Sequence, residues 1–144
     1  MKFTVEIKIN LARNKIIELF DSTENLKKWQ PGLLSFEHQS GTPGEVGAKS
    51  RLQYKMGKRE IEMVETITVK NLPDEFSGIY EAKGVRNEVK NYFYKVDKNT
   101  NKWVSENEFR CSGFIKIIAF FMPGSFKKET MKYLEYFKEF TENS

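Results

Sequence analysis

The sequence predicts an α+β fold in which a curved antiparallel sheet wraps around a long C-terminal helix. Three observations predict it. The first ten residues alternate between polar and apolar side chains. The middle of the chain is a series of strand-like segments separated by local turn signals. From Ser125 to about Glu142, apolar residues recur at steps of three and four, the spacing of a helix with one buried face.

The N-terminal part predicts one strand followed by two short helices. Alternation over residues 2–9 is the period of a strand with one dry face. Apolar residues then recur with helical spacing over residues 12–20. A second short helix has Leu26 and Trp29 on one side, and Pro31-Gly32 ends it.

The middle of the chain predicts a meander of about six strands, which gives a sheet of six or seven strands in all. Short connections make neighbouring strands antiparallel. Long antiparallel strands accumulate twist, so such a sheet curls and has to close on itself or wrap another element. The turn signals are Gly41–Gly47, Gly57, Asn71-Leu72-Pro73-Asp74, Gly84 and Asn99-Thr100-Asn101.

The C-terminal helix is the element that the sheet can wrap. Its stripe is formed by Phe126, Thr130, Tyr133, Phe137 and Phe140, with charged residues opposite and Ser125 as a candidate cap. Pro123-Gly124 separates it from an apolar run, Phe114 to Met122. We expect Phe114, Phe120 and Phe121 to lie in the core or over a pocket. The alternative is an amphipathic membrane role if those aromatics are exposed.

Composition excludes several classes of protein. The 144 residues fit one domain, 1–144. The 24 Lys and Arg residues are interspersed with 20 Asp and Glu residues, which does not predict nucleic-acid binding. One cysteine, Cys111, and one histidine, His38, are too few for a structural zinc site, and no phosphate-binding or dinucleotide motif occurs. We therefore expect no metal and no cofactor.

The same features bear on location and assembly. The apolar run is far shorter than the roughly 20 residues of a spanning helix, so we expect no integral membrane segment. The chain starts with a strand pattern instead of a signal peptide, and a single cysteine fits a reducing compartment. We expect a cytoplasmic protein, and the sequence is compatible with a homodimer.

The order of elements and two short segments resemble those of the SRPBCC superfamily. The segments are Trp29-Gln30-Pro31-Gly32 after the helix pair and the turn Asn71-Leu72-Pro73. This superfamily includes START lipid-transfer domains, polyketide cyclases and dehydratases, and birch-pollen-allergen-like proteins. The resemblance covers the whole chain. It implies the helix-grip fold, with a cavity for a hydrophobic small molecule between sheet and helix, but it implies no particular activity.

The inward faces of the predicted strands suggest the site. Over residues 60–70, Glu65 lies on the apolar face formed by Ile61, Met63, Ile67 and Val69. Corresponding positions on other strands are aromatic, aliphatic or amide side chains, and a few polar groups on a concave apolar surface are typical of a small-molecule pocket. We expect a ligand to contact Trp29, Tyr54, Met63, Tyr80, Asn91, Asn107 and Phe109.

Glu65 is the candidate catalytic residue. A carboxylate on a dry face loses hydration, which favours its neutral form and makes it a candidate general acid or base. Two alternatives remain at this point. A β-bulge would turn Glu65 to water, and a lysine or arginine at the sheet rim would pair with it. His38 is a second candidate base, for which a place at the rim is the simpler interpretation.

Three functions are compatible with these patterns. The first is binding or carrying a hydrophobic or aromatic small molecule, lipid- or polyketide-like, in an internal cavity. The second is a cyclase- or dehydratase-like enzyme with Glu65 as general acid/base and Tyr54 or Tyr80 polarising a carbonyl. The third is a protein-interaction module, which a filled interior would favour.

Overall fold

The structure is a computed structural model that describes residues 1–144 apart from the side chain of Met56. Its elements follow the order expected from the sequence: one strand, two short helices, six strands, and a long terminal helix. They are β1 (Lys2–Ile9), α1 (Arg13–Phe20), the 3-10 turn η1 (Thr23–Asn25), α2 (Leu26–Trp29), β2 (Leu33–Ser40), β3 (Lys49–Met56), β4 (Arg59–Asn71), β5 (Glu75–Ala82), β6 (Val85–Asp97), β7 (Thr100–Cys111), α3 (Gly113–Phe121) and α4 (Pro123–Glu142).

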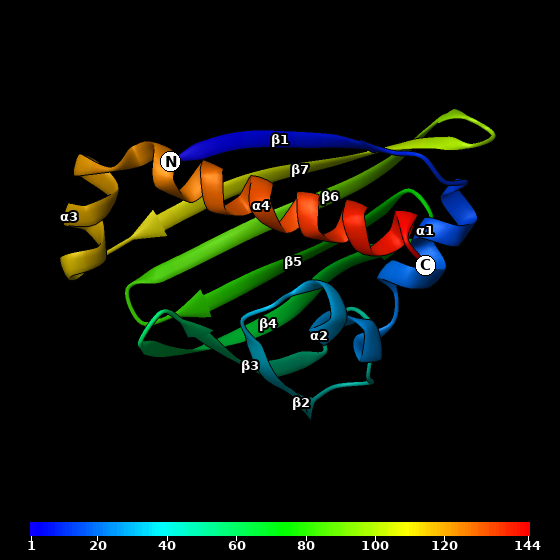
Figure 1. Ribbon diagram of the computed structural model, residues 1–144. Helices are drawn as coiled ribbons and strands as arrows, with labels where there is room; N and C mark the ends of the chain where they lie inside the picture. Colours follow the sequence, from blue (N-terminus) through cyan, green and yellow to red (C-terminus); the bar gives the residue numbers. More distant parts are fainter.

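The strands form one antiparallel sheet of seven strands in the order β1-β7-β6-β5-β4-β3-β2. Strands β2 to β7 are hydrogen-bonded to their sequence neighbours, and β1 closes the order beside β7. Strands β4 and β6 have 13 residues each, long enough for their twist to curl the sheet around α4 (Figure 1). The predicted α+β fold is confirmed.

A cluster of aromatic side chains holds the C-terminal half of α4 against the sheet. Phe137 is fully buried and meets Trp29 and Trp103 edge-to-face, with ring centroids 5.0 and 5.2 Å apart. Phe20 from α1 packs on Phe93 at 5.0 Å. Edge-to-face aromatic pairs add to the free energy gained by burying the rings. This cluster fills the concave face at one end of the grip.

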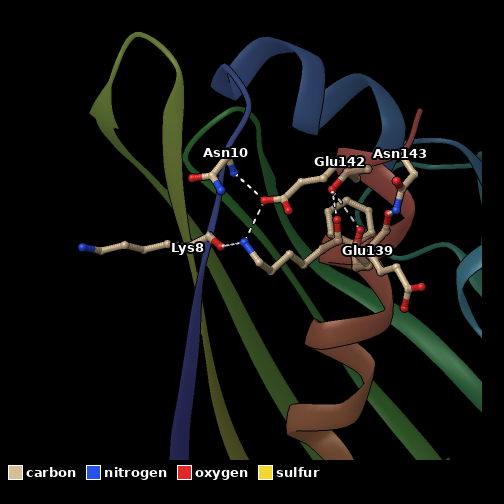
Figure 2. Close-up of polar contacts among 8 residues, drawn as sticks. Lys8, Asn10, Glu139, Glu142 and Asn143 are labelled. Atoms are coloured by element: carbon tan, nitrogen blue, oxygen red, sulfur yellow. Dashed lines mark hydrogen bonds and ion pairs between the residues drawn. The ribbon is translucent and has the colours of Figure 1, made fainter.

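Polar contacts fasten the same end of α4 to β1 (Figure 2). The Lys138 Nζ donates hydrogen bonds to the Lys8 carbonyl and to Glu142 Oε2, both at 2.7 Å. The backbone N–H of Asn10 donates to the same Glu142 oxygen at 2.8 Å. One carboxylate therefore joins the last turn of the helix to the residue that follows β1.

The segment before α4 differs from the expectation. It forms a separate helix, α3, and its Phe114, Phe120 and Phe121 side chains are exposed, so the prediction that they lie in the core or over a pocket was wrong. The reason is that α4 already covers the concave face, and α3 lies beyond the end of the sheet (Figure 1). Gly113, with φ of 59°, turns the chain out of β7.

Helix α4 itself begins at Pro123 instead of at Ser125. Proline is tolerated in the first helical turn, where its missing N–H has no intrahelical partner. The Ser125 hydroxyl donates to the Met122 carbonyl at 2.9 Å. Among the described helices, none is both long and apolar enough to cross a bilayer.

Candidate functional site

A cavity of about 740 Å³ lies between the concave face of the sheet and the N-terminal half of α4. Phe126, Thr130 and Tyr133 of α4 line one side, and strands β3 to β7 line the other. All of the residues predicted from the sequence to form the site line this cavity: Trp29, Tyr54, Met63, Glu65, Tyr80, Asn91, Asn107 and Phe109. The structure thus brings together side chains from α2 and five different strands.

The core is packed at the end of the concave face near the C-terminus of α4, and the cavity lies toward the other end. Phe93, Trp103 and Phe137 pack the end near the C-terminus of α4. Toward the other end, small side chains occupy inward positions of the sheet, including Ser50 and Ser105, both buried. Small residues facing a helix leave a gap that the backbone of a hydrogen-bonded sheet cannot close.

Polar side chains form a row across the floor of the cavity. Ser50 on β3 pairs with Glu65 on β4, Glu65 with Tyr80 on β5, and Tyr80 with Asn87 on β6. Phe109 on β7 pairs with Asn87 and ends the row. Residues paired across strands share a face of the sheet, so the row of four polar groups spans roughly 14 Å at the usual spacing between strands.

A β-bulge does occur in β4, but it lies between Ile67 and Val69 and leaves Glu65 facing inward. Beyond the bulge the register shifts. Val69 pairs with Ser77, whereas Lys70 pairs with Phe76, which lines the cavity. Val69 is therefore on the opposite face, and its predicted inward position was wrong because the bulge inserts one residue into the strand.

Burial raises the pKa of the Glu65 carboxyl above its usual value, and a hydrogen bond with the Tyr80 hydroxyl opposes part of that rise. Both side chains retain some exposure, and the surface they expose faces the cavity. Among the described side chains that line the cavity there is no lysine or arginine, so no cation there offsets the lost hydration of the carboxylate.

The pKa of Tyr80 is raised well above its usual value, first by burial and then by the charge of Glu65 and the hydrogen bond to it. Tyr80 therefore stays protonated and acts as a hydrogen-bond donor at any physiological pH. The Tyr80 hydroxyl, which stays protonated, thus lies next to the Glu65 carboxyl, which is neutral over a wider pH range than usual. Such a pair can bind an oxygen atom or exchange a proton with one.

Tyr54 is fixed by a different partner. Its hydroxyl donates to Gln30 Oε1 at 2.6 Å, and burial, followed by the charges of Tyr133 and Glu65, raises its pKa. Gln30 belongs to the segment Trp29-Gln30-Pro31-Gly32, and the Lys55 N–H donates to the Gly32 carbonyl at 2.8 Å. The hydroxyl proton of Tyr54 is engaged by Gln30. The hydroxyl proton of Tyr80 becomes available to a ligand when the Glu65 carboxyl is protonated, because the acid can then donate to the Tyr80 oxygen.

The side-chain amides of Asn87, Asn91 and Asn107 differ in which of their hydrogen-bonding atoms already have a partner. Asn91 Oδ1 accepts from Trp103 Nε1 at 2.9 Å, and Asn107 Nδ2 donates to Ser105 Oγ at 3.0 Å. Asn87 Nδ2 reaches Asn107 Oδ1 at 3.5 Å. Within the part of the chain whose side chains are described, Asn87 Oδ1 and Trp29 Nε1 are buried without a hydrogen-bond partner. The fully buried atoms of the site thus include an acceptor and a donor that are available to a ligand.

Some lining residues were not among the expected ligand contacts. Asn87 shares the alternation that pointed to Asn91, and Tyr133 lies on the predicted stripe of α4, so signals for both were present. Glu129 also lines the cavity, although its charge placed it on the polar face of the helix. His38 is exposed and lies at the edge of the cavity on β2.

Comparisons with known proteins agree with this architecture. No family model and no curated protein matches the chain in sequence. Ara h 8.0201 superposes with a TM-score of 0.78 at 13% identity, over 100% of this chain and 99% of the other. The Zhui aromatase/cyclase from Streptomyces gives 0.79 at 9% identity, over 99% and 93%.

A third similar structure is norcoclaurine synthase from Thalictrum flavum in complex with dopamine and hydroxybenzaldehyde. It gives a TM-score of 0.74 at 14% identity, over 99% of this chain and 87% of the other. At such identities the similarity shows a shared fold, and it confirms the architecture that the sequence resemblance implied.

Proposed function

We propose, from the helix-grip fold that this chain shares with SRPBCC proteins, that it binds a hydrophobic small molecule in the cavity under α4. The observation that carries the proposal is the cavity itself, about 740 Å³ with mostly apolar walls and one row of polar groups. Ligand pockets are commonly about 300–1,000 Å³ and have this composition. The similar norcoclaurine synthase structure is a complex with dopamine and hydroxybenzaldehyde, which supports an aromatic ligand for this cavity.

The polar row narrows the class of ligand. Tyr80 and the protonated form of Glu65 donate hydrogen bonds, which suits a carbonyl or phenolic oxygen. The absence of lysine and arginine among the described lining residues makes the cavity unfavourable for a carboxylate or phosphate group, which would be buried without a counter-ion. We therefore expect a neutral or cationic molecule with an aromatic or extended carbon skeleton.

Fluorescence of the neutral probe N-phenylnaphthylamine tests the binding proposal. We expect enhanced emission with the wild-type protein. Ser50→Trp places a large side chain at one end of the polar row, so we expect it to abolish the enhancement. Gln53→Trp, on the outer face of the same strand, is the matched control and should bind the probe like the wild type. Full binding by a folded Ser50→Trp protein would contradict the proposal.

The Glu65–Tyr80 pair favours a second candidate function, proton transfer as in a cyclase or dehydratase. In this scheme Glu65 removes or adds a proton next to a carbonyl whose oxygen is held by Tyr80. The raised pKa of Glu65 brings the carboxyl closer to neutral pH, where proton exchange is most effective.

Exchange of the methyl protons of acetophenone in heavy water, followed by NMR, separates the two candidates. Catalysed exchange that falls by about a hundredfold or more in Glu65→Gln, with probe binding kept, supports proton transfer. Catalysed exchange that persists unchanged in this variant removes Glu65 from the mechanism. Binding of the probe without any catalysed exchange leaves ligand carriage as the function.

A further inference from the structure

Helix α3 presents an apolar surface that nothing else in the described chain covers. The side chains of Phe114, Phe120 and Phe121 are 65%, 79% and 75% exposed, and Ile117 and Met122 are exposed as well. The helix lies at one end of the molecule, beyond the sheet (Figure 1). Contiguous apolar patches of this kind on a folded protein mark sites of contact with another protein or a membrane.

The opposite face of α3 packs against the β5–β6 turn. This packing fixes the direction in which the exposed apolar face points. The Ser112 N–H donates to the Gly84 carbonyl at 2.9 Å in the β5–β6 turn. Ile115 packs against the same glycine, where an added Cβ would meet Ile115 Cγ1 at 3.2 Å. Ile115, Ile118 and Ala119 are half-buried. The helix thus has an inner face on the protein and an outer face of aromatic and aliphatic side chains.

Basic side chains surround this helix. Lys116 lies on α3, Lys83 is in the turn that α3 contacts, and Lys127 and Lys128 are in the first turns of α4. None of the ion pairs between described side chains involves these four lysines. Of the acids nearby, Glu108 pairs with Arg110 and Lys2, and Glu129 pairs with Lys132. Among the described side chains, Glu81 and Glu135 are in no ion pair, so the four lysines face two uncompensated acids.

We propose that α3 docks the protein on an anionic membrane surface, with its aromatic side chains in the lipid interface and the four lysines over the headgroups. Apolar side chains next to basic ones are what an interfacial helix uses to bind anionic lipid. A second copy of the chain is a poorer partner, since joining two α3 faces brings like charges together. Docking of this kind needs no spanning segment.

The docked orientation also relates to the cavity. Ser125 and Phe126, immediately after the junction of α3 and α4, line the cavity, as do Ala82 and Val85 on either side of the turn that α3 contacts. Docking through α3 therefore brings this end of the cavity to the lipid surface. That consequence rests on the proposed ligand-binding function, whereas docking itself does not.

Co-sedimentation with vesicles tests the proposal. We expect the wild-type protein to bind vesicles of phosphatidylcholine with phosphatidylglycerol and not vesicles of phosphatidylcholine alone. Replacing Phe120 and Phe121 together by serine should weaken binding by at least tenfold or so. Each of Lys127→Gln and Lys128→Gln should weaken it by about fivefold, the effect of one basic residue near an anionic surface.

The matched control replaces Tyr94 and Val96 by serine. These side chains are also exposed but lie on β6 toward the far end of the molecule, so vesicle binding should not change. Wild-type protein that stays in the supernatant with both kinds of vesicle would overturn the proposal. If the protein instead forms a dimer that the Phe120/Phe121 variant abolishes, the occupant of the helix is a second copy. Neither result affects the probe-binding test of the cavity.

Discussion

Glu65 and Tyr80 lie directly opposite each other on β4 and β5, and hydrogen bonding with the Tyr80 hydroxyl acts to lower the pKa of the Glu65 carboxyl. The contact joins the one acid on the cavity side of β4 to a tyrosine that does not ionise at physiological pH. The hydrogen bond stabilises the charged form of the acid, while burial stabilises the neutral form. The protonation state of the pair is thus set by two opposing effects that separate variants can measure.

Tyr80→Phe should raise the pKa of Glu65 further, because burial remains and the hydrogen bond that opposes it is lost. Titration of the labelled Glu65 carboxyl carbon by NMR measures the change. Tyr136→Phe removes a hydroxyl from an exposed tyrosine on α4 and should leave this pKa where it is. An unchanged or lower pKa of Glu65 in Tyr80→Phe would show that the contact does not stabilise the carboxylate.

Glu65→Gln should change how stability depends on pH. Because the folded-state pKa of Glu65 is raised, the unfolded chain loses this proton first as pH increases. The contribution of Glu65 to stability is thus full below the unfolded pKa and is lost as pH rises through the folded one. Chemical unfolding across this range should show the wild type losing stability relative to the glutamine variant. A constant difference between the two would contradict the raised pKa.

The fold could be predicted from sequence because its determinants are local. Alternation over residues 2–9, the glycine and proline turn signals, and the stripe from Phe126 to Phe140 each fix an element from its own residues. The environment of α3 could not be predicted from sequence, because a run of apolar residues has the same pattern whether the helix is buried or exposed. That distinction depends on α4 already occupying the concave face, which is a property of the assembled chain.

The site was predicted in part for the same reason. Period two identified which residues of each strand face inward, and the eight expected residues do line the cavity. The sequence did not predict the register, that is, which residues of neighbouring strands pair with each other. Only pairing between strands places Ser50, Glu65, Tyr80 and Asn87 in one row, and only the bulge after Ile67 turns Val69 outward. Neither can be obtained from a single strand taken alone.

Gly32 should be intolerant of any side chain. A Cβ at this position would lie 2.8 Å from the Lys55 carbonyl oxygen, a backbone atom held in the sheet. We expect Gly32→Ala to lower the free energy of unfolding by about 1–3 kcal/mol and to disturb the contact between Gln30 and Tyr54. Gly124→Ala is the control, because nothing lies within 4 Å of the added Cβ. Urea unfolding of both variants decides, and equal stability would refute the steric argument.

The hydrogen bonds that join Glu142 and Lys138 at the C-terminus of α4 to β1 and Asn10 should stabilise the docking of this helix on the sheet. Glu142 is partly buried, which acts to raise its pKa, yet the hydrogen bonds from Lys138 and Asn10 outweigh this and lower it. Its stabilising effect is therefore present above the unfolded pKa and lost as pH falls through the folded one. Glu142→Ala should cost about 1–2 kcal/mol at neutral pH and speed amide exchange in the last turn of α4. Glu139→Ala, which changes an exposed side chain of the same turn, is the control and should change neither stability nor amide exchange. Equal effects of the two variants would show that helix propensity, and not the hydrogen bonds of Glu142, stabilises this end.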